Sequence, residues 1–358
     1  MNKSFTLKSS PTLLVLFLLA ILILSTVSGW CQKPIDLTYG HPSPPQTITG
    51  QLHERYAKEI EEATNERVKV TVYPADSLFK QKDTVSAIET GISDIGEIQV
   101  ATSPGVFNLA EVMFLPFLYT NSSPALPTYE INTRVINDLL DTMPEIQEEF
   151  SRFKVLYIGG QETYYIASVK KPIEKLEDLK GMKIRVVGRY ATKVVEKLGA
   201  TAVSIPVADL YDAAAKGVID GALVISDFID SFSVHQILPY WTKVPLWNSV
   251  IVKLMNKQAW ESLPADVQEQ VMSVSGYEKG LEQAEVRFGL EAQKKWQELM
   301  DKDGKHITYF TLPEDEVLRW KEIAGEPIWE EWVKEMEEKG LAGQKVLDKT
   351  IELYKKYE

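Results

Sequence analysis

Cysteine, histidine and long apolar stretches are scarce in this chain of 358 residues. Because Cys31 is the single cysteine, no internal disulfide can form. The one long apolar run, Leu13 to Leu24, has only 12 residues, which is too short for a membrane-spanning helix. The four histidines do not occur at the spacings of metal-binding motifs, so we predict no metal site.

Signatures of catalysis and of cofactor binding are also missing. The sequence has no Gly-x-Ser-x-Gly elbow, no His-Glu-x-x-His, no phosphate-binding loop and no Gly-x-Gly-x-x-Gly. We therefore predict no catalytic residue and no cofactor, and we favour a binding protein over an enzyme. The 51 acidic and 39 basic residues give a net charge of −12, which argues against nucleic acid as a partner.

Residues 1–29 have the pattern of a secretory signal peptide. Lys3 and Lys8 precede the apolar run, and small residues follow it, so cleavage is expected after Ser28 or Gly29. Cleavage would remove two lysines and no acid, changing the net charge from −12 to −14. The mature protein is therefore predicted to be periplasmic or otherwise extracytoplasmic.

Cys31 raises the alternative of a lipid anchor at the mature N-terminus. Trp30 is a poor match to the residue that precedes the cysteine in a lipoprotein signal. An anchor at Cys31 is therefore the lesser alternative, and a mature chain without lipid is the prediction.

Alternating strand and helix patterns predict an α/β fold. Strands at about 37–40, 68–72 and 94–100, separated by helical segments, give the β-α-β-α-β order that is typical of a parallel sheet. A second alternation of the same kind runs to about residue 225. Gly91-x-x-Asp94 and Gly217-x-x-Asp220 recur at corresponding places, which indicates two similar lobes with a ligand cleft between them.

A long amphipathic helix is expected from about residue 265 to 302, running across both lobes as a spine. Its apolar stripe is Tyr277, Leu281, Ala284, Phe288, Ala292, Trp296 and Leu299. The predicted divisions are lobe I at 34–160 plus about 249–290, lobe II at 161–248 plus about 291–335, and a helical tail at 336–358.

Arg185 is the exception in its strand. Met182–Val187 is β-branched and lies between Gly181 and Gly188, and a strand covered on both faces should be apolar throughout. Near the carboxyl end of such a strand, a guanidinium points to the crevice where open α/β sheets hold ligands, and it offers a rigid fork to a carboxylate. From the residues alone, an ion pair with a neighbouring acid is an equal alternative.

Several motifs in order resemble the solute-binding subunits of TRAP (tripartite ATP-independent periplasmic) transporters. They are Gly181-Met-Lys-Ile-Arg-Val, Leu198-Gly-Ala, Pro206-x-x-Asp-Leu-Tyr and Gly217-Val-Ile-Asp-Gly, with Gly91-x-x-Asp-Ile-Gly and Leu115-Pro-Phe-Leu before them. The resemblance covers nearly all of the mature chain. It implies two α/β lobes with a hinge, capture of an organic acid in their cleft, and delivery to TRAP permease subunits driven by an ion gradient.

The resemblance also assigns site residues. In the family, the arginine of the Lys-Ile-Arg-Val strand clamps the ligand carboxylate, and here this residue is Arg185. Positions that line the family's cleft align with His41 and Gln99, for which a loop residue and a polar strand end are the alternatives. Arg189 is either a second cation for a dicarboxylate or the start of a helix.

Two sequence differences from the sialate-binding members of the family indicate a different class of substrate. Tyr164 stands where those members have a further arginine, and Val224 stands where they have an asparagine, with Ser226 nearby. These changes remove polar groups and disfavour a sugar acid. Aromatic residues that could wall a pocket for an apolar or aromatic body are Tyr164, Tyr165, Trp241 and Trp247.

We therefore expect a receptor for a small monocarboxylate, such as an oxo acid. The predicted substrate-binding residues are Arg185, Tyr164, Gln99, His41, Ser226 and Trp247. The alternatives are a secreted enzyme, or a receptor coupled to a sensor protein, built on the same two-lobe scaffold.

Overall fold

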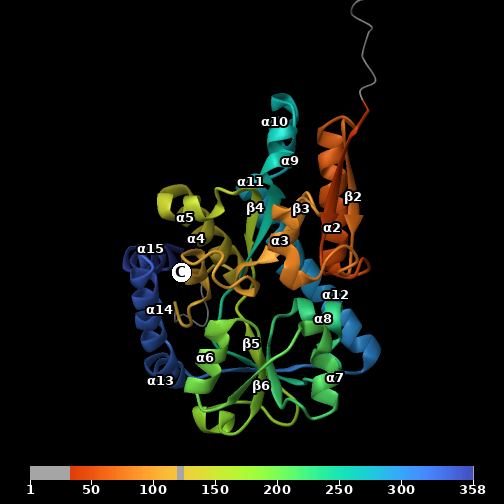
Figure 1. The fold of residues 1–358 in the computed structure, drawn as a ribbon. Helices are drawn as coiled ribbons and strands as arrows, with labels where there is room; N and C mark the ends of the chain where they lie inside the picture. The colour runs from red at the N-terminus through yellow and green to blue at the C-terminus, as the bar shows by residue number, and fades with distance from the viewer. Residues whose placement is uncertain (1–32, 119–124, 358) are drawn as a thin grey trace, which may run out of the picture. The chain divides into compact units, whose positions relative to one another are not determined.

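The computed structural model describes residues 33–118 and 125–357, so the predicted signal peptide and Cys31 lie outside the described residues. The described strands form one five-stranded and one six-stranded sheet, with helices around each (Figure 1). We call the part built on the five-stranded sheet lobe I and the part built on the six-stranded sheet lobe II. The predicted two-lobed α/β architecture is confirmed.

Lobe I has strands in the order β2-β1-β3-β10-β4. β1 and β3 are parallel, as the sequence predicts, but β10 is antiparallel to both of its neighbours. β10 follows the chain's return from lobe II, and the sequence does not show in which direction a returning strand enters a sheet. The strands are β1 (Ile35–Gly40), β2 (Val68–Tyr73), β3 (Ile95–Gln99), β4 (Phe153–Gly160) and β10 (Val250–Asn256). The helices are α2 (Ile48–Ala63), α3 (Thr84–Glu89), α4 (Thr128–Thr142), α5 (Pro144–Phe150), α9 (Lys257–Ser262), α10 (Ala265–Ser273) and α11 (Gly276–Phe288).

Lobe II has strands in the order β11-β9-β5-β8-β6-β7. β6 is parallel to β7 and β8, as predicted, whereas β5 is antiparallel to β8 and β9. Figure 1 shows α6 and α7 on either side of β5 and β6. The strands are β5 (Tyr165–Ser168), β6 (Lys183–Val186), β7 (Thr201–Ser204), β8 (Gly221–Val224), β9 (Tyr240–Lys243) and β11 (Thr308–Thr311). The helices are α6 (Arg189–Lys197), α7 (Leu210–Ala215), α8 (Asp227–Phe232) and α12 (Leu290–Asp303).

The predicted long helix is present as three successive helices, α10, α11 and α12. The apolar stripe continues through α11 and α12, but Gly289 between them is extended, with ψ −174°. α11 packs on β4 of lobe I and α12 packs on α8 of lobe II, so this segment braces both lobes as predicted. α4 and α5 of lobe I are likewise two helices, because Pro144 starts a new helix rather than continuing the preceding one.

The C-terminal helices are α13 (Glu314–Ala324), α14 (Glu326–Glu338) and α15 (Gly343–Tyr357). α13 and α14 pack on α6 of lobe II, whereas α15 packs on α4 of lobe I. Trp320 and Trp332 are fully buried in this layer. Among the described helices, none has both the length and the hydrophobicity that crossing a membrane requires.

The chain passes between the two sheets through residues 161–164, 244–249 and Gly289. β3 and β6 end with their carboxyl ends at Gln99 and Val186, and these ends open onto the cavity described below. The short 3₁₀ helices are η1 (Gln81–Asp83), η2 (Val100–Thr102), η3 (Ala110–Phe114), η4 (Leu176–Leu179), η5 (Val207–Asp209) and η6 (Val234–Gln236).

Candidate functional site: the interlobe cavity

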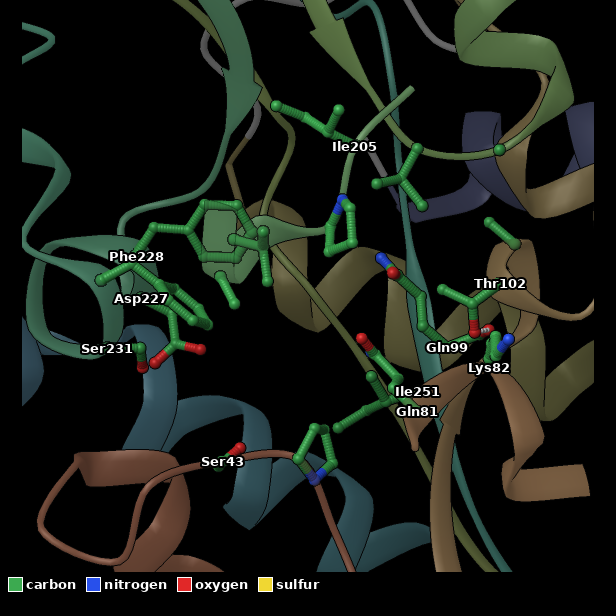
Figure 2. A pocket seen from close by; sticks show the side chains of 18 of the residues that line it. Ser43, Gln81, Lys82, Gln99, Thr102, Ile205, Asp227, Phe228, Ser231 and Ile251 are labelled. Atoms are coloured by element: carbon green, nitrogen blue, oxygen red, sulfur yellow. Dashed lines mark hydrogen bonds between the residues drawn. The ribbon is translucent and has the colours of Figure 1, made fainter. Parts of the chain in front are cut away.

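A cavity of about 850 Å³ is lined by residues of both lobes. Lobe I contributes the end of β3 and the loops after β1 and β2, and lobe II contributes the end of β6, the loop after β7 and α8. In Figure 2, Gln99, Thr102 and Ile251 face Asp227 and Phe228 across this space. The carboxyl ends of strands are where open α/β sheets hold ligands.

Arg185 of β6 lines this cavity and is only 3% exposed. Its Nε donates a hydrogen bond to the carbonyl oxygen of Ile205 at 3.0 Å. Ile205 follows β7, so this bond fixes the direction of the guanidinium from the neighbouring strand. Within the described chain, Nη1 and Nη2 have no protein partner, so their N–H groups remain available to a ligand.

No ion pair joins Arg185 to an acid within residues 33–118 and 125–357. Burial lowers the pKa of Arg185 to about 10, and Tyr164 offsets only part of this effect. The guanidinium is therefore still positive at neutral pH. Because a buried charge without a counter-ion is costly, an anion entering the cavity would be strongly attracted to this position.

Gln99 and Tyr164 belong to a polar cluster that lines the cavity together with Arg185. The Gln99 Nε2 atom lies 2.8 Å from the Tyr164 hydroxyl, 2.7 Å from the Ser249 hydroxyl and 3.1 Å from Gln161 Oε1. Burial raises the pKa of Tyr164, so its hydroxyl stays neutral. The cluster ties the end of β3 to two of the links between the lobes.

The wall around this polar end is largely apolar. Trp247 lines a small extension of about 10 Å³ beside Arg185, and its ring packs edge-on against Phe114. Trp247 is 3% exposed and therefore closes the back of the site. Further apolar residues along the cavity are Ala101, Val187, Ile205, Pro206, Phe228 and Ile251.

Gly188 follows β6 next to Arg185. Its φ is +85°, a conformation that favours glycine, whereas a Cβ there would make only an ordinary contact, 3.4 Å from the Ala101 Cβ of lobe I. The glycine that bounds the predicted strand is therefore explained by its backbone conformation.

His41 and Ser226 lie outside the lining of the described cavity. The His41 ring is 2% exposed and packs against the His53 ring at an angle of 39°, with 3.9 Å between the ring centroids. Ser226 precedes α8, and its N–H donates to the Glu162 carboxylate. An alignment gives the position of a residue along the chain but not the direction of its side chain, which explains both placements.

Arg287 at the end of α11 also lines the cavity, but protein acids neutralise it. Its Nη2 lies 3.2 Å from Asp227 Oδ2 and its Nη1 lies 3.6 Å from Glu97 Oε1. Glu97 is also 3.1 Å from the buried Lys253 Nζ. Burial lowers the pKa of Arg287, but Asp227 and Glu97 outweigh this effect and raise it.

Arg189 starts α6 and is likewise occupied. Its guanidinium binds Glu111 of η3 in lobe I and lies 2.6 Å from Glu335 of α14. Burial lowers the pKa of Arg189, but the hydrogen bonds to Glu335 and Glu111 outweigh it and raise the pKa. Arg189 therefore starts a helix, as one of its two alternatives predicts, and its side chain also lines the cavity with its charge already paired.

Tyr165 and Trp241 do not line this cavity; their rings pack on each other and on Tyr309 of the outer strand β11. In the described part of the chain, no group of three or more His, Cys, Asp or Glu side chains is placed to hold a metal ion.

Several residues at the cavity had no assigned role in the sequence analysis: Glu97, Gln161, Ile205, Asp227 and Arg287. Two of them left a signal, since Glu97 is a charge inside a predicted buried strand and Arg287 is adjacent to Phe288 of the apolar stripe. Ile205 acts through its backbone carbonyl, which no side-chain pattern reveals.

Comparison with known proteins agrees with this fold. The family model for bacterial extracellular solute-binding protein, family 7, matches residues 39–336. The structure of a TRAP periplasmic solute-binding protein from Desulfovibrio salexigens is 29% identical, with a TM-score of 0.76, and the match covers 90% of this chain and 97% of that chain.

Two further relatives differ in what they bind. A marine metagenome TRAP solute-binding protein specific for aromatic acid ligands, in complex with metahydroxyphenylacetate, is 26% identical with a TM-score of 0.80, over 90% of this chain and 99% of that chain. The C4-dicarboxylate-binding periplasmic protein of Rhodobacter capsulatus is 25% identical, over 81% of this chain and 84% of that protein. The resemblance to TRAP receptors is confirmed, and the chain belongs to the bacterial extracellular solute-binding proteins of family 7.

Proposed function

We propose that the protein captures a small organic acid in the interlobe cavity by pairing the ligand's carboxylate with Arg185. The observation that carries this proposal is a guanidinium that is 3% exposed, fixed by Ile205, and without a carboxylate partner in the described chain. A planar carboxylate matches the guanidinium fork with two parallel hydrogen bonds. The ligand then supplies the counter-charge that residues 33–118 and 125–357 do not.

The ligand of this site carries one carboxylate. Near Arg287 the cavity already contains Asp227 and Glu97, so a second ligand carboxylate would meet two protein acids there. Lys80 and Lys82 at the edge of the cavity are exposed, and solvent screens their attraction. This charge arrangement supports a ligand like that of the aromatic-acid-binding relative, rather than a C4-dicarboxylate.

The body of the ligand is apolar or aromatic. Val187, Ile205 and Phe228 of lobe II face Ile251 of lobe I around the space next to Arg185. Burying a ring or a branched aliphatic chain among them contributes favourable transfer energy, whereas hydroxyl groups of a sugar acid would lose their water without enough partners. Gln99, Tyr164 and Trp247 complete the site, and His41 and Ser226 support it from behind its walls.

Binding favours closure of the lobes. A ligand held by Arg185 and Phe228 of lobe II gains its contacts with Gln99 and Ile251 of lobe I only when the cavity is closed. The closed complex delivers the acid to TRAP permease subunits, which use an ion gradient for uptake. The receptor releases the acid unchanged and does not catalyse a reaction.

We also propose the location and division of the mature chain. Residues 1–29 are removed on export, so the receptor acts outside the cytoplasm. Lobe I consists of 34–160 plus about 249–290, lobe II of 161–248 plus about 291–335, and 336–358 form a helical tail. The pairing of β10 with β3 and β4 supports the return of the chain to lobe I at about residue 249. Mass spectrometry of the exported protein tests the cleavage site.

Calorimetric titration with benzoate, 3-hydroxyphenylacetate and succinate tests the function. We expect the monocarboxylates to bind more tightly than succinate. We expect Arg185→Met to weaken binding by about 2–5 kcal/mol, which is roughly 30-fold or more. Arg319→Met, which removes an arginine that is 43% exposed and is not among the residues lining the cavity, is the matched control. Unaltered affinity in Arg185→Met would sink the proposal, and chromatography of the released acid would reveal any turnover.

A further inference from the structure

We infer that Gln99 makes this site selective for acids whose substituent beside the carboxylate donates a hydrogen bond, so that a 2-hydroxy acid binds in preference to the matching 2-oxo acid. The inference rests on the proposed function, because it takes the ligand carboxylate to be on Arg185. It concerns the substituent on the carbon next to that carboxylate. Neither the charge of the site nor its apolar walls specify which substituent is preferred there.

The amide nitrogen of Gln99 is committed to the protein. Its Nε2 lies within 3.1 Å of three oxygens, those of Gln161, Tyr164 and Ser249. An amide nitrogen carries only two hydrogens, so these acceptors use all of its donor capacity. Gln99 therefore has no N–H left to offer to a ligand.

The amide oxygen of Gln99 is left for the ligand. Gln99 lines the cavity, and its Oε1 accepts no hydrogen bond from a described residue. This oxygen is not among the fully buried atoms without a partner, so it is accessible from the cavity. Figure 2 shows the Gln99 side chain reaching from β3 into the cavity. The positive charge of Arg185, which borders the same small space, favours this orientation because it attracts the oxygen end of the amide dipole.

Among the described side chains around the small space beside Arg185, Gln99 is the one with a free acceptor. Apart from Gln99 and Arg185, the only polar residue around the small space is Tyr164, whose hydroxyl already interacts with Gln99 and Ser249. Arg185 can only donate. Gln161 lines the large cavity but not this space. The atom next to the bound carboxylate therefore meets the oxygen of Gln99.

The three kinds of acid differ in how they meet this oxygen. A 2-hydroxyl donates its proton to Gln99 Oε1 and satisfies it. A 2-oxo group places a second acceptor against the first, which leaves both without a proton. An acid with no substituent leaves Gln99 Oε1 unpaired in a site closed to water. A net hydrogen bond corresponds to about tenfold in affinity, so we expect the hydroxy acid to bind about tenfold more tightly than either analogue.

Calorimetric titration of the mature protein with two matched series tests this. The first series is mandelate, phenylglyoxylate and phenylacetate, and the second is 4-methylpentanoate with a 2-hydroxy group, a 2-oxo group or neither. In the series that binds, the ratio of the affinities for hydroxy and oxo acid should be about ten. In Gln99→Met, which removes the amide with little change in volume, the ratio should fall to about one.

The outcomes separate this inference from the proposed function. A tighter oxo acid, or a ratio that survives Gln99→Met, overturns the role of Gln99 while leaving capture by Arg185 intact. Arg185→Met should weaken all three acids of a series to a similar degree, and if it has no effect the proposed function itself fails. If Gln99→Met does not fold, the wild-type ratio alone decides, because an amide turned the other way would prefer the oxo acid.

Discussion

Arg185 and Arg287 are both buried and both border the same cavity, but they differ in their partners. Arg287 lies between Asp227 and Glu97, and its pKa is raised by these acids. Among the described residues, Arg185 hydrogen-bonds only to the carbonyl of Ile205, and burial lowers its pKa to about 10. Position in a cleft is therefore not enough to identify a ligand-binding arginine; what distinguishes Arg185 is that the described protein provides no acid for it.

The paired arginines join the lobes. Asp227 of lobe II binds Arg287 of α11 and also accepts a hydrogen bond from the Thr49 hydroxyl of lobe I at 3.0 Å. On another side, Arg189 of lobe II binds Glu111 of lobe I. These contacts hold the two lobes together around the cavity, whereas the guanidinium of Arg185 remains available to bind a ligand.

Of the variants that test the difference between paired and unpaired arginines, Arg287→Met should lose the most stability. The change removes the shared partner of Asp227 and Glu97 and leaves Asp227 without a cation in a buried site. We expect the free energy of unfolding to fall by about 3–5 kcal/mol, measured by chemical denaturation without ligand.

The double variant Arg287→Met with Asp227→Asn provides the control. Because it also removes the charge that Arg287→Met leaves unpaired, it should recover part of the lost stability. If Arg287→Met is as stable as the wild type, the network around Arg287 does not hold the lobes as described.

Lowering the pH should reduce the stability of the protein through the buried histidines of lobe I, without changing the charge of Arg185. Burial, together with the charge of Lys253, lowers the pKa of His41 to about 4, below its ordinary 6.5. The unfolded chain therefore binds a proton at His41 between pH 6.5 and 4 that the folded chain does not, so stability falls as the pH drops through this window, by about 3 kcal/mol. His53, whose pKa is also lowered by burial, adds to the same trend.

Thermal melting at pH 7, 5.5 and 4.5 measures this effect. His41→Phe keeps a ring to pack against His53 but removes the titrating group, so the dependence on pH should become shallower. The affinity for a monocarboxylate should stay constant from pH 7 to 5.5, because Arg185 does not titrate there. A melting curve with the same pH dependence in His41→Phe and wild type would contradict the assignment.

The sequence predicts the parts of this arrangement that depend on local patterns. Met182–Val187 is β-branched between two glycines, and it forms β6 with Arg185 as the one buried charge. The direction of β10 and the break at Gly289 were not predictable, because the first depends on the path of the chain between lobes and the second interrupts an intact apolar stripe.

The same limit applies to the site. Gln99 and Tyr164 both line the cavity. Gln99 is the last residue of β3, whose carboxyl end faces the cavity, and Tyr164 belongs to the link between the lobes that precedes β5. The acids that occupy Arg287 come from β3 and α8, more than a hundred residues apart in the sequence, so no local pattern shows that Arg287 is paired and Arg185 is not.

Arg185→Met should have the opposite effect on stability from Arg287→Met. Without ligand, the change removes a buried charge that has no counter-ion, so we expect the free energy of unfolding to rise by about 1–2 kcal/mol. A saturating monocarboxylate should raise the melting temperature of the wild type but not of the variant. A loss of stability as large as that of Arg287→Met would mean that Arg185 has a partner of its own.

The smallest effect is expected for the double variant Arg189→Met with Glu111→Gln. The Glu111 side chain is only 3% exposed, so replacing it as well avoids leaving a buried acid without its cation. Arg189 is 29% exposed and its other partner Glu335 is 30% exposed, so water and salt weaken that ion pair, and we expect a loss of about 1 kcal/mol that shrinks as sodium chloride is raised. Affinity for a monocarboxylate should change far less than in Arg185→Met, since Glu111 and Glu335 already occupy the guanidinium. If titration instead shows the same loss of affinity in both variants, an arginine already bound to two acids would be binding the ligand as well. The presence or absence of protein carboxylates would then not be what separates the two kinds of arginine in this cleft.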